Sequence, residues 1–252
     1  MDTHDREQFN QVVKRFGPLV GRAHEINRQM LIPALADGQA AMVLDGKLSS
    51  KHFVQALPAT QDPMPMLEPA LVVGVSDAKL LRRAIVEYRK VLNGVIDAIR
   101  EIEPGSIPDE YAIPDPQVTE DKAGTIYHYW LPEEWGVDKK IAPSFGLSKT
   151  VAVVAITKEH ARRLLRATPL SIAGVLGGAD RPLAAAAMFD WAGLVDAATP
   201  WVNLAVEKIN EESENDPDTS ASIASQVGTV LEVLKVLRTI TSESDSCFVR
   251  QT

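Results

Sequence analysis

The sequence predicts an α+β fold in which helices pack on one face of an antiparallel sheet. Apolar runs of strand length alternate with helical patterns between residues 71 and 189. Their order is strand, helix, strand, strand, helix, strand, which is the split β-α-β plan of ferredoxin-like sandwiches. A helical segment at 3–36 precedes a core at 39–190, and a helical hairpin at 191–241 follows it. The whole stretch 1–252 is expected to be one domain or a fragment of a longer protein.

The N-terminal segment has the period of a helix. Apolar residues step by three and four between Phe9 and Met30, which places them on one helix face. Pro18 lacks an N–H and clashes with the preceding turn, so a kink or break is expected there. Gly38 ends the helical pattern, and Gln39–Asp45 is predicted to be a strand that extends the sheet.

The first half of the core begins with a loop, because Pro58–Pro69 contains four prolines. The strand Leu71–Val75 follows, and then the clearest helix of the chain. The apolar stripe of this helix consists of Leu81, Ile85, Tyr88, Leu92, Val95 and Ile99. After a second proline-rich loop, Thr125–Leu131 is rich in aromatic and β-branched residues and is predicted to be a strand.

The second half of the core continues with Val151–Ile156, which is apolar on both faces and is therefore predicted to be a central strand. A helix at Lys158–Arg166 and a strand at Leu183–Phe189 follow. The helices Trp191–Glu211 and Ser220–Thr241 complete the predicted elements.

Two segments of the core resemble each other. Leu71–Arg83 and Val151–Arg163 are each an apolar run, a hydroxyl residue and a helical pattern. This arrangement indicates an internal repeat in which a strand leads into a helix. Ser76 and Thr157 are the predicted N-caps, because a side-chain oxygen there accepts a hydrogen bond from an otherwise unpaired backbone N–H.

Charge and composition exclude several classes of function. The net charge is −8 and no Lys/Arg cluster is present, which argues against nucleic-acid binding. No apolar run is long enough for a transmembrane segment, and no secretory signal is recognised at the start. The single Cys247 rules out an internal disulfide. The five histidines lack metal-ligand spacing and no phosphate-binding glycine motif occurs, so no metal or cofactor is expected.

One motif suggests catalysis. Gly74–Ala78 resembles the G-x-S-x-G nucleophile elbow, with Ser76 as nucleophile and His128 or His160 as base. The alternative, that Ser76 caps a helix, is favoured because Thr157 takes the same role without elbow glycines. A serine-type hydrolase is therefore the weaker hypothesis.

The best candidate binding surface is aromatic and consists of Tyr127, Tyr129, Trp130 and Trp135. On a strand, Tyr127 and Tyr129 share one face and Trp130 belongs to the other. One of these faces is available for a ligand or a partner if it is exposed. Burial of both faces is the more common outcome, because large aromatic residues are highly buried on average.

Four stretches carry a resemblance to a known family, namely Leu35–Ala41, Pro65–Leu71, Gly146–Ser148 and Phe189–Val195. They resemble long, uncharacterised proteins of planctomycete-type bacteria, which are related to families labelled only as domains of unknown function. The resemblance implies tandem α+β units in an exported, envelope-associated protein with an extracytoplasmic or periplasmic location. It implies no catalytic residue, because the shared positions are packing and turn residues.

The leading functional hypothesis is a non-enzymatic binding or structural module with a protein partner or self-association. An oligomerisation module using the Ser220–Thr241 helix is a further alternative. The apolar stripe of that helix consists of Val227, Val230, Leu231, Leu234 and Leu237. The Trp191–Glu211 helix, a second copy or further chain after Thr252 is expected to cover these side chains, since exposing five of them is costly. The intramolecular hairpin is favoured because the connection is short.

Overall fold

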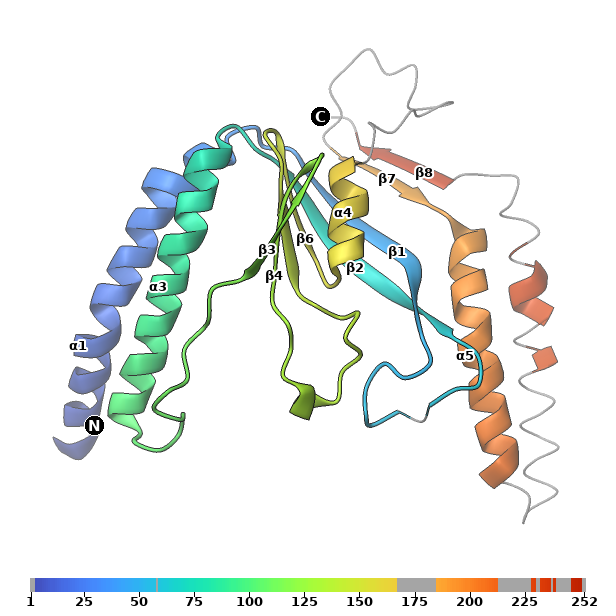
Figure 1. Cartoon of the computed structure of the whole chain (residues 1–252), viewed down its shortest axis with the longest axis horizontal. Helices are drawn as coiled ribbons and strands as arrows, with labels where there is room; N and C mark the ends of the chain where they lie inside the picture. Colours follow the sequence, from blue (N-terminus) through green and yellow to red (C-terminus); the bar gives the residue numbers. More distant parts are fainter. Residues whose placement is uncertain are drawn as a thin grey trace. The chain divides into compact units, whose positions relative to one another are not determined.

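The computed structural model describes residues 3–57, 59–166, 185–212, 228–229, 232–236, 238 and 246–250, and Figure 1 shows their secondary structure. The contacts divide the chain into two compact units. The first unit consists of Met1–Val43, Ala70–Leu131 and Lys139–Arg166, and the second of Leu44–Pro69, Pro132–Asp138 and Ala167–Thr252. Each unit is described by itself.

The main sheet has six strands in the order β1-β2-β6-β5-β4-β3. Their bounds are β1 Ala40–Ser50, β2 Met64–Gly74, β3 Gln117–Asp121, β4 Gly124–His128, β5 Ser144–Leu147 and β6 Val151–Ala155. Neighbouring strands from β2 to β3 pair antiparallel. The predicted α+β class and antiparallel sheet are therefore confirmed. The predicted central strand is confirmed as well, since β6 lies between β2 and β5 and Val153 is fully buried.

The strand order differs from the ferredoxin-like plan. The strands β3 and β5 were not predicted, and β4 ends at His128 rather than at Leu131. The predicted last strand of the core is β7, Ala185–Phe189, which pairs with β8, Ser246–Arg250, in a separate two-stranded sheet. A short polar strand such as β3 carries little period-two signal, so its pairing with β4 was not recognisable in the sequence.

The strand β2 is longer than predicted. It has 11 residues and begins at Met64, so the second half of the predicted Pro58–Pro69 loop is strand. The strand tolerates prolines in this part because β6 pairs with β2 only from Ala70 to Gly74. Pro65 and Pro69 precede that segment, and their missing N–H groups therefore break no bond to β6.

Two long helices of the first unit lie side by side. They are α1, Thr3–Ile26, and α3, Ala78–Ile102. The buried contacts include Ile26 and Val91, and the Tyr88 hydroxyl donates to the Ala23 carbonyl at 3.4 Å. The expected break at Pro18 is wrong, because α1 runs through it. A π-helical turn follows instead at Asn27–Leu31, before the short helix α2, Ile32–Ala34.

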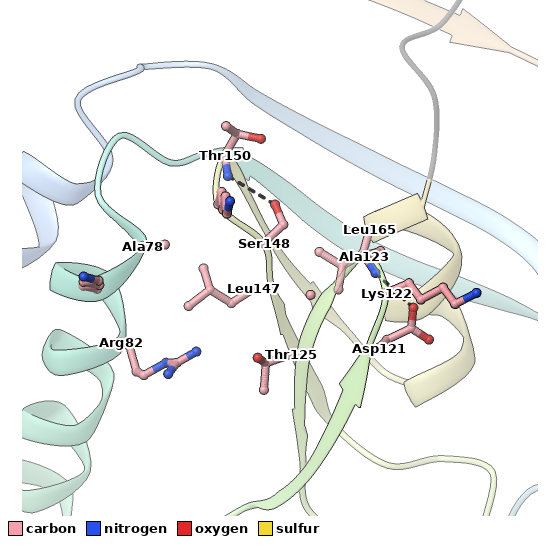
Figure 2. Close-up of a pocket in the computed structure, with 13 residues that line it drawn as sticks. Ala78, Arg82, Asp121, Lys122, Ala123, Thr125, Leu147, Ser148, Thr150 and Leu165 are labelled. Atoms are coloured by element: carbon pink, nitrogen blue, oxygen red, sulfur yellow. Dashed lines mark hydrogen bonds between the residues drawn. The ribbon is translucent and has the colours of Figure 1, made fainter.

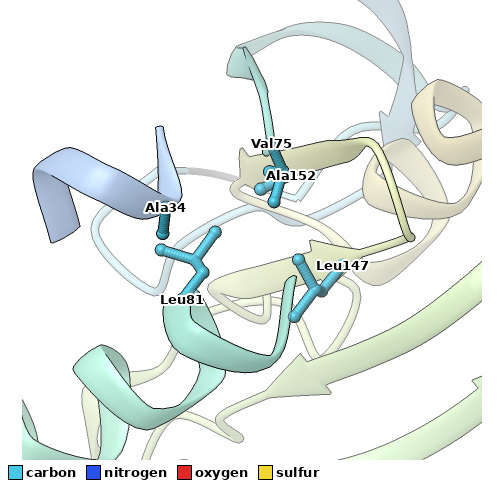
Figure 3. Packing of buried hydrophobic residues seen from close by; sticks show 5 residues of the cluster. All are labelled: Ala34, Val75, Leu81, Leu147 and Ala152. Atoms are coloured by element: carbon cyan, nitrogen blue, oxygen red, sulfur yellow. The ribbon is translucent and has the colours of Figure 1, made fainter. Parts of the chain in front are cut away.

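The two faces of the sheet have different covers. The helix α4, Lys158–Arg166, packs Ala161 on the face that contains Ile126 and Val153, as expected for a helix on a sheet. A second cluster holds α2 and the first turns of α3 against the other face. Figure 3 shows its five buried residues, Ala34, Val75, Leu81, Leu147 and Ala152.

The caps of α3 and α4 correct one prediction and confirm another. Asp77, not Ser76, caps α3, because Asp77 Oδ1 accepts hydrogen bonds from the N–H groups of Lys79 and Leu80 at 2.9 Å each. Thr157 caps α4, since its Oγ1 accepts from the N–H of His160 at 3.0 Å. Asp77 and Thr157 both stand directly before their helix. The hydroxyl residue common to the two similar segments suggested Ser76 as the cap. The residue directly before α3 is Asp77, however, and aspartate is an equally good cap.

In the second unit, α5, Trp191–Glu212, matches the predicted helix and continues through Pro200. The Trp201 ring stacks on Phe53 with centroids 5.9 Å apart, and its Nε1 donates to the Pro65 carbonyl. Residues 228–229, 232–236 and 238 are helical. Arg238 Nε donates to Asp196 Oδ1 at 2.6 Å, so this part of the predicted Ser220–Thr241 helix contacts α5. The stripe residues Val227, Val230, Leu231 and Leu237 lie outside the described residues.

Candidate functional site

A cleft of about 630 Å³ lies in the first unit, between the start of α3 and two turns of the sheet. Figure 2 shows the side chains that line it. The helix contributes Ala78, Lys79 and Arg82, the β3–β4 turn contributes Asp121–Thr125, and the end of β5 with the following turn contributes Leu147–Thr150. Leu165 of α4 completes the lining. All these elements belong to one compact unit.

Four cations line this cleft, namely Lys79, Arg82, Lys122 and Lys149. None of them has an ion-pair partner among the residues that the structure describes. The Arg82 guanidinium lies 5.8 Å from the centroid of the Tyr127 ring, where a cation–π interaction can hold it. In Figure 2 this side chain extends from α3 towards β4. Since the whole chain has a net charge of −8, this is a local reversal of sign.

Asp121 is the one carboxylate among the described residues that line the cleft. Arg166 Nε donates to its Oδ1 at 3.1 Å, and Arg162 Nε lies 3.3 Å from its Oδ2. The pKa of Asp121 is lowered, chiefly by the hydrogen bond from Arg166 and next by that from the N–H of Ala123. Asp121 is therefore ionised near neutral pH, and two arginines outside the cleft compensate its charge.

The two turns that form the wall of the cleft are fixed by local contacts. A Cβ on Gly124 would lie 2.4 Å from the Leu147 carbonyl oxygen, so only glycine lets the β3–β4 turn approach β5 this closely. Ser148 Oγ accepts from the N–H groups of Thr150 and Val151 at 3.2 and 2.9 Å. The backbone that carries Lys122 and Lys149 is thus held in place without a ligand.

The chemistry that this lining offers is ionic. The hydroxyl of Thr125 donates to the Glu120 carboxylate at 3.0 Å, and that of Ser148 is used in its own turn. Four positive side chains remain to meet a ligand. Within the described residues, no group of three His, Cys, Asp or Glu side chains could hold a metal ion. Every described helix is also too short or too polar to pass through a lipid bilayer.

The structure does not bring the suggested catalytic residues together. Ser76 is exposed and does not line the cleft, and among the described residues its hydroxyl has no hydrogen bond to a histidine. His128 and His160 are buried. The pKa of His128 is lowered, first by burial and second by the charge of Lys158. This histidine is therefore neutral at pH 7.

The predicted aromatic surface is split. Tyr127 is half-buried, contacts Phe145 with centroids 6.1 Å apart and faces Arg82. Trp130 is exposed and meets His128 edge-on at 5.0 Å. Tyr129 is half-buried, while Trp135 is exposed and belongs to the second unit. Tyr127 is the residue of this set that contacts a side chain of the cleft.

The cationic residues of the cleft were not among the site residues predicted from the sequence. Lys79 and Arg82 are three positions apart in the first two turns of a helix, and this spacing could have indicated a shared face. Lys122 and Lys149 are isolated in their turns. They reach the same cleft because Thr125 pairs with Leu147 across β4 and β5. No sequence signal predicts that register.

No family model, curated protein or solved structure matches this chain.

Proposed function

We propose that this protein is a non-enzymatic binding module whose cleft in the first unit takes a small anionic ligand. The observation that carries the proposal is the set of four cations around one cavity of an acidic chain, with no ion-pair partner in the described part of the structure. Carboxylate and phosphate groups are the anions that Lys and Arg side chains recognise.

The dimensions of the cleft suit a small molecule. Its volume of about 630 Å³ lies within the range of small-ligand pockets. Ala78, Leu147 and Leu165 add an apolar part to the lining. The preferred ligand therefore has a charged group and an apolar portion, with the charged group beside Arg82 and Lys149.

The expected affinity is modest and depends on salt. An exposed ion pair contributes about 0.2–1 kcal/mol. Screening shortens the reach of such charges to roughly 8 Å at physiological ionic strength. Binding should therefore weaken clearly as salt is added.

On the resemblance alone, we also propose that the module belongs to an envelope-associated bacterial protein, which cell fractionation with an antibody to the chain would test.

The binding test is a titration of the ¹⁵N-labelled chain with inorganic phosphate and with citrate, followed by amide chemical shifts. Saturable shifts are expected at Lys79, Gly124 and Thr150. The double variant Arg82→Gln/Lys149→Gln should bind about tenfold more weakly, because two ion pairs are lost.

A charge-matched control is the double variant Lys14→Gln/Lys90→Gln, in which both lysines lie outside the cleft. It should bind like the wild type. Shifts that do not saturate, or equal weakening in the two double variants, would show that the chain attracts anions only through diffuse charge, and the proposal would fail.

A further inference from the structure

Six apolar side chains form a row across one face of the main sheet, with one residue from each strand. In the order of the strands they are Met42, Leu71, Val154, Phe145, Tyr127 and Val118, and we call them the apolar row. From β2 to β3, each member lies directly opposite the next in the cross-strand register. On β1, Val43 packs with the cluster on the α4 face, so the alternation along a strand turns Met42 to the other face. All six residues belong to the first unit.

Most of the apolar row is in contact with water. The exposed fractions are 87% for Met42, 56% for Val118, 53% for Val154 and 44% for Leu71. The helix α4 packs on the opposite face, while α2 and the first turns of α3 cover this face only around Leu147 and Ala152. Strands lie about 4.8 Å apart, so the row extends over about 24 Å. A continuous apolar strip of this kind marks a place where a ligand or a partner binds.

The apolar row is continuous with the cationic cleft. Thr125 and Leu147 line the cleft and pair with each other across β4 and β5, and Figure 2 shows both on the side of the sheet that faces Arg82. Two positions further along the same strands, which is about 7 Å, the same face carries Tyr127 and Phe145 of the row. The guanidinium of Arg82, itself a lining residue of the cleft, lies 5.8 Å from the centroid of the Tyr127 ring. Positive charge and apolar surface therefore meet at Arg82.

The other charges near the row are already paired. Between the row and the turns of the sheet, the face carries one carboxylate among the described residues, Glu120 on the edge strand β3. The Thr125 hydroxyl donates to that carboxylate at 3.0 Å. Arg89, two turns after Arg82 on α3, forms an ion pair with Asp115. An anionic group near the row therefore finds its cations at the cleft, where Arg82 lies.

We infer that the ligand of the cleft is a fatty carboxylate, whose charged group binds at the cleft and whose alkyl chain lies along the apolar row. The inference rests on the proposed function, since the cleft must take the anion. The lengths agree: one acyl chain fills half of a hydrocarbon core of about 30 Å, which is about 15 Å. Three strand spacings, about 14 Å, separate Tyr127 from Leu71. Arg82 forms the junction, because its charge meets the carboxylate while its methylene stem borders the row.

A thin alkyl chain suits this face better than a second sheet does. The first turns of α3 lie on the same face, where Leu81 packs with Leu147 and Arg82 lies over Tyr127. A flat partner would meet this helix before it covered the β4 end of the row. Charge also favours the small ligand, because two copies of a chain with a net charge of −8 repel each other, whereas the cations of the cleft attract a carboxylate.

The experiment is calorimetric titration of the full chain with octanoate and with dodecanoate, each below the concentration at which it forms micelles. Dodecanoate should bind about 15-fold more tightly than octanoate, because each added methylene gains about twofold when half of its surface leaves water. The double variant Leu71→Thr/Val154→Thr removes apolar surface where the longer chain ends, so the ratio should fall to about threefold or less. Its affinity for inorganic phosphate should equal that of the wild type. Both positions are exposed, so circular dichroism and the melting temperature should stay close to those of the wild type.

The matched control is Val13→Thr/Val20→Thr, which changes two exposed valines of α1 and should keep the wild-type ratio. Equal affinity of the wild type for octanoate and dodecanoate would overturn the inference, and phosphate binding that persists would leave the proposed function intact. Failure of phosphate and dodecanoate alike would refute both.

Two further measurements test the orientation of the ligand and the identity of the occupant. The double variant Arg82→Gln/Lys149→Gln should bind dodecanoate about tenfold more weakly, because two ion pairs with the carboxylate are lost. An unchanged affinity would mean that the carboxylate lies elsewhere, and the inference would be wrong. It would also be wrong if sedimentation without ligand found a wild-type dimer that Leu71→Thr/Val154→Thr converts to a monomer, since the row would then be covered by a second copy.

Discussion

Arg166 donates from Nε to Oδ1 of Asp121 at 3.1 Å, and this pair joins the last turn of α4 to the β3–β4 turn. The Asp121 side chain is only 8% exposed, and the N–H of Ala123 donates to the same oxygen. A helix on one face of the sheet therefore holds a turn whose residues line the cleft. Fold stability and the position of Lys122 are coupled through one carboxylate.

Asp121→Asn is expected to lower the melting temperature at neutral pH, because the amide keeps the shape but loses the charge that the arginines meet. The folded pKa of Asp121 is below the ordinary 3.8. Its contribution to stability is thus present above pH 3.8 and is lost as the pH falls through the folded pKa. In melting curves from neutral to acidic pH, the melting temperature of the variant should approach that of the wild type below the folded pKa of Asp121. Asp97→Asn, which removes an exposed partner of Arg100, is the control and should have little effect at any pH.

His128 makes a second pH-dependent contribution to stability, at a higher pH than Asp121. Its folded pKa is below 6.5, so the unfolded chain binds more protons and stability falls as the pH falls below 6.5. His128→Phe keeps an aromatic ring and should show a weaker loss of melting temperature between about pH 6.5 and 5. The exposed His52→Gln serves as control. Parallel curves for wild type and His128→Phe would contradict the assignment.

The helices and the central strand were predictable because their patterns are long or unmistakable. The apolar stripe of α3 runs from Leu81 to Ile99 in a helix of 25 residues, and β6 is apolar on both faces. The structure adds that only part of this stripe is buried, since Leu81 is buried while Ile85 and Leu92 are exposed. Periodicity shows which face is apolar but not what covers it.

Pairing and the candidate site were not predictable to the same degree. The strands β3 and β5 have 5 and 4 residues, too few for a reliable alternation signal. The cleft depends on the register that places Thr125 opposite Leu147 and on the side-chain contact of Asp121 with Arg166. Both are long-range relationships, and a single sequence carries no local signal for them.

Asp77 provides a direct test of the corrected cap. Asp77→Ala should lower the free energy of unfolding by about 1 kcal/mol, because two N–H groups of α3 lose their acceptor. Asp77→Ser should retain most of the stability that the cap contributes. Ser76→Ala is the matched neighbour and should be close to wild type in urea denaturation. A larger effect at Ser76 than at Asp77 would restore the original prediction.

Gly124 tests the close approach between the β3–β4 turn and β5. Gly124→Ala is expected to destabilise by roughly 1–3 kcal/mol, because the added Cβ would collide with the backbone of Leu147 and the backbone must move. Gly21→Ala is the control, since a Cβ there meets nothing within 4 Å. It should stabilise α1 by about 0.5–1 kcal/mol through helix propensity. Calorimetry that finds equal effects of the two changes would refute the tight turn.

Leu234 decides between the two interpretations of the C-terminal helix. Together with Val195 and Thr199 of α5 it lines a cavity of about 380 Å³ in the second unit, and Arg238 one turn later pairs with Asp196. If the helix packs within its own chain, Leu234→Glu places a charge against α5 and lowers the melting temperature at every protein concentration. Val233→Glu, at an exposed neighbouring position, should change it little. If Leu234→Glu instead leaves the melting temperature of the monomer unchanged and removes only self-association in sedimentation, the helix is an interface and the intramolecular hairpin is wrong.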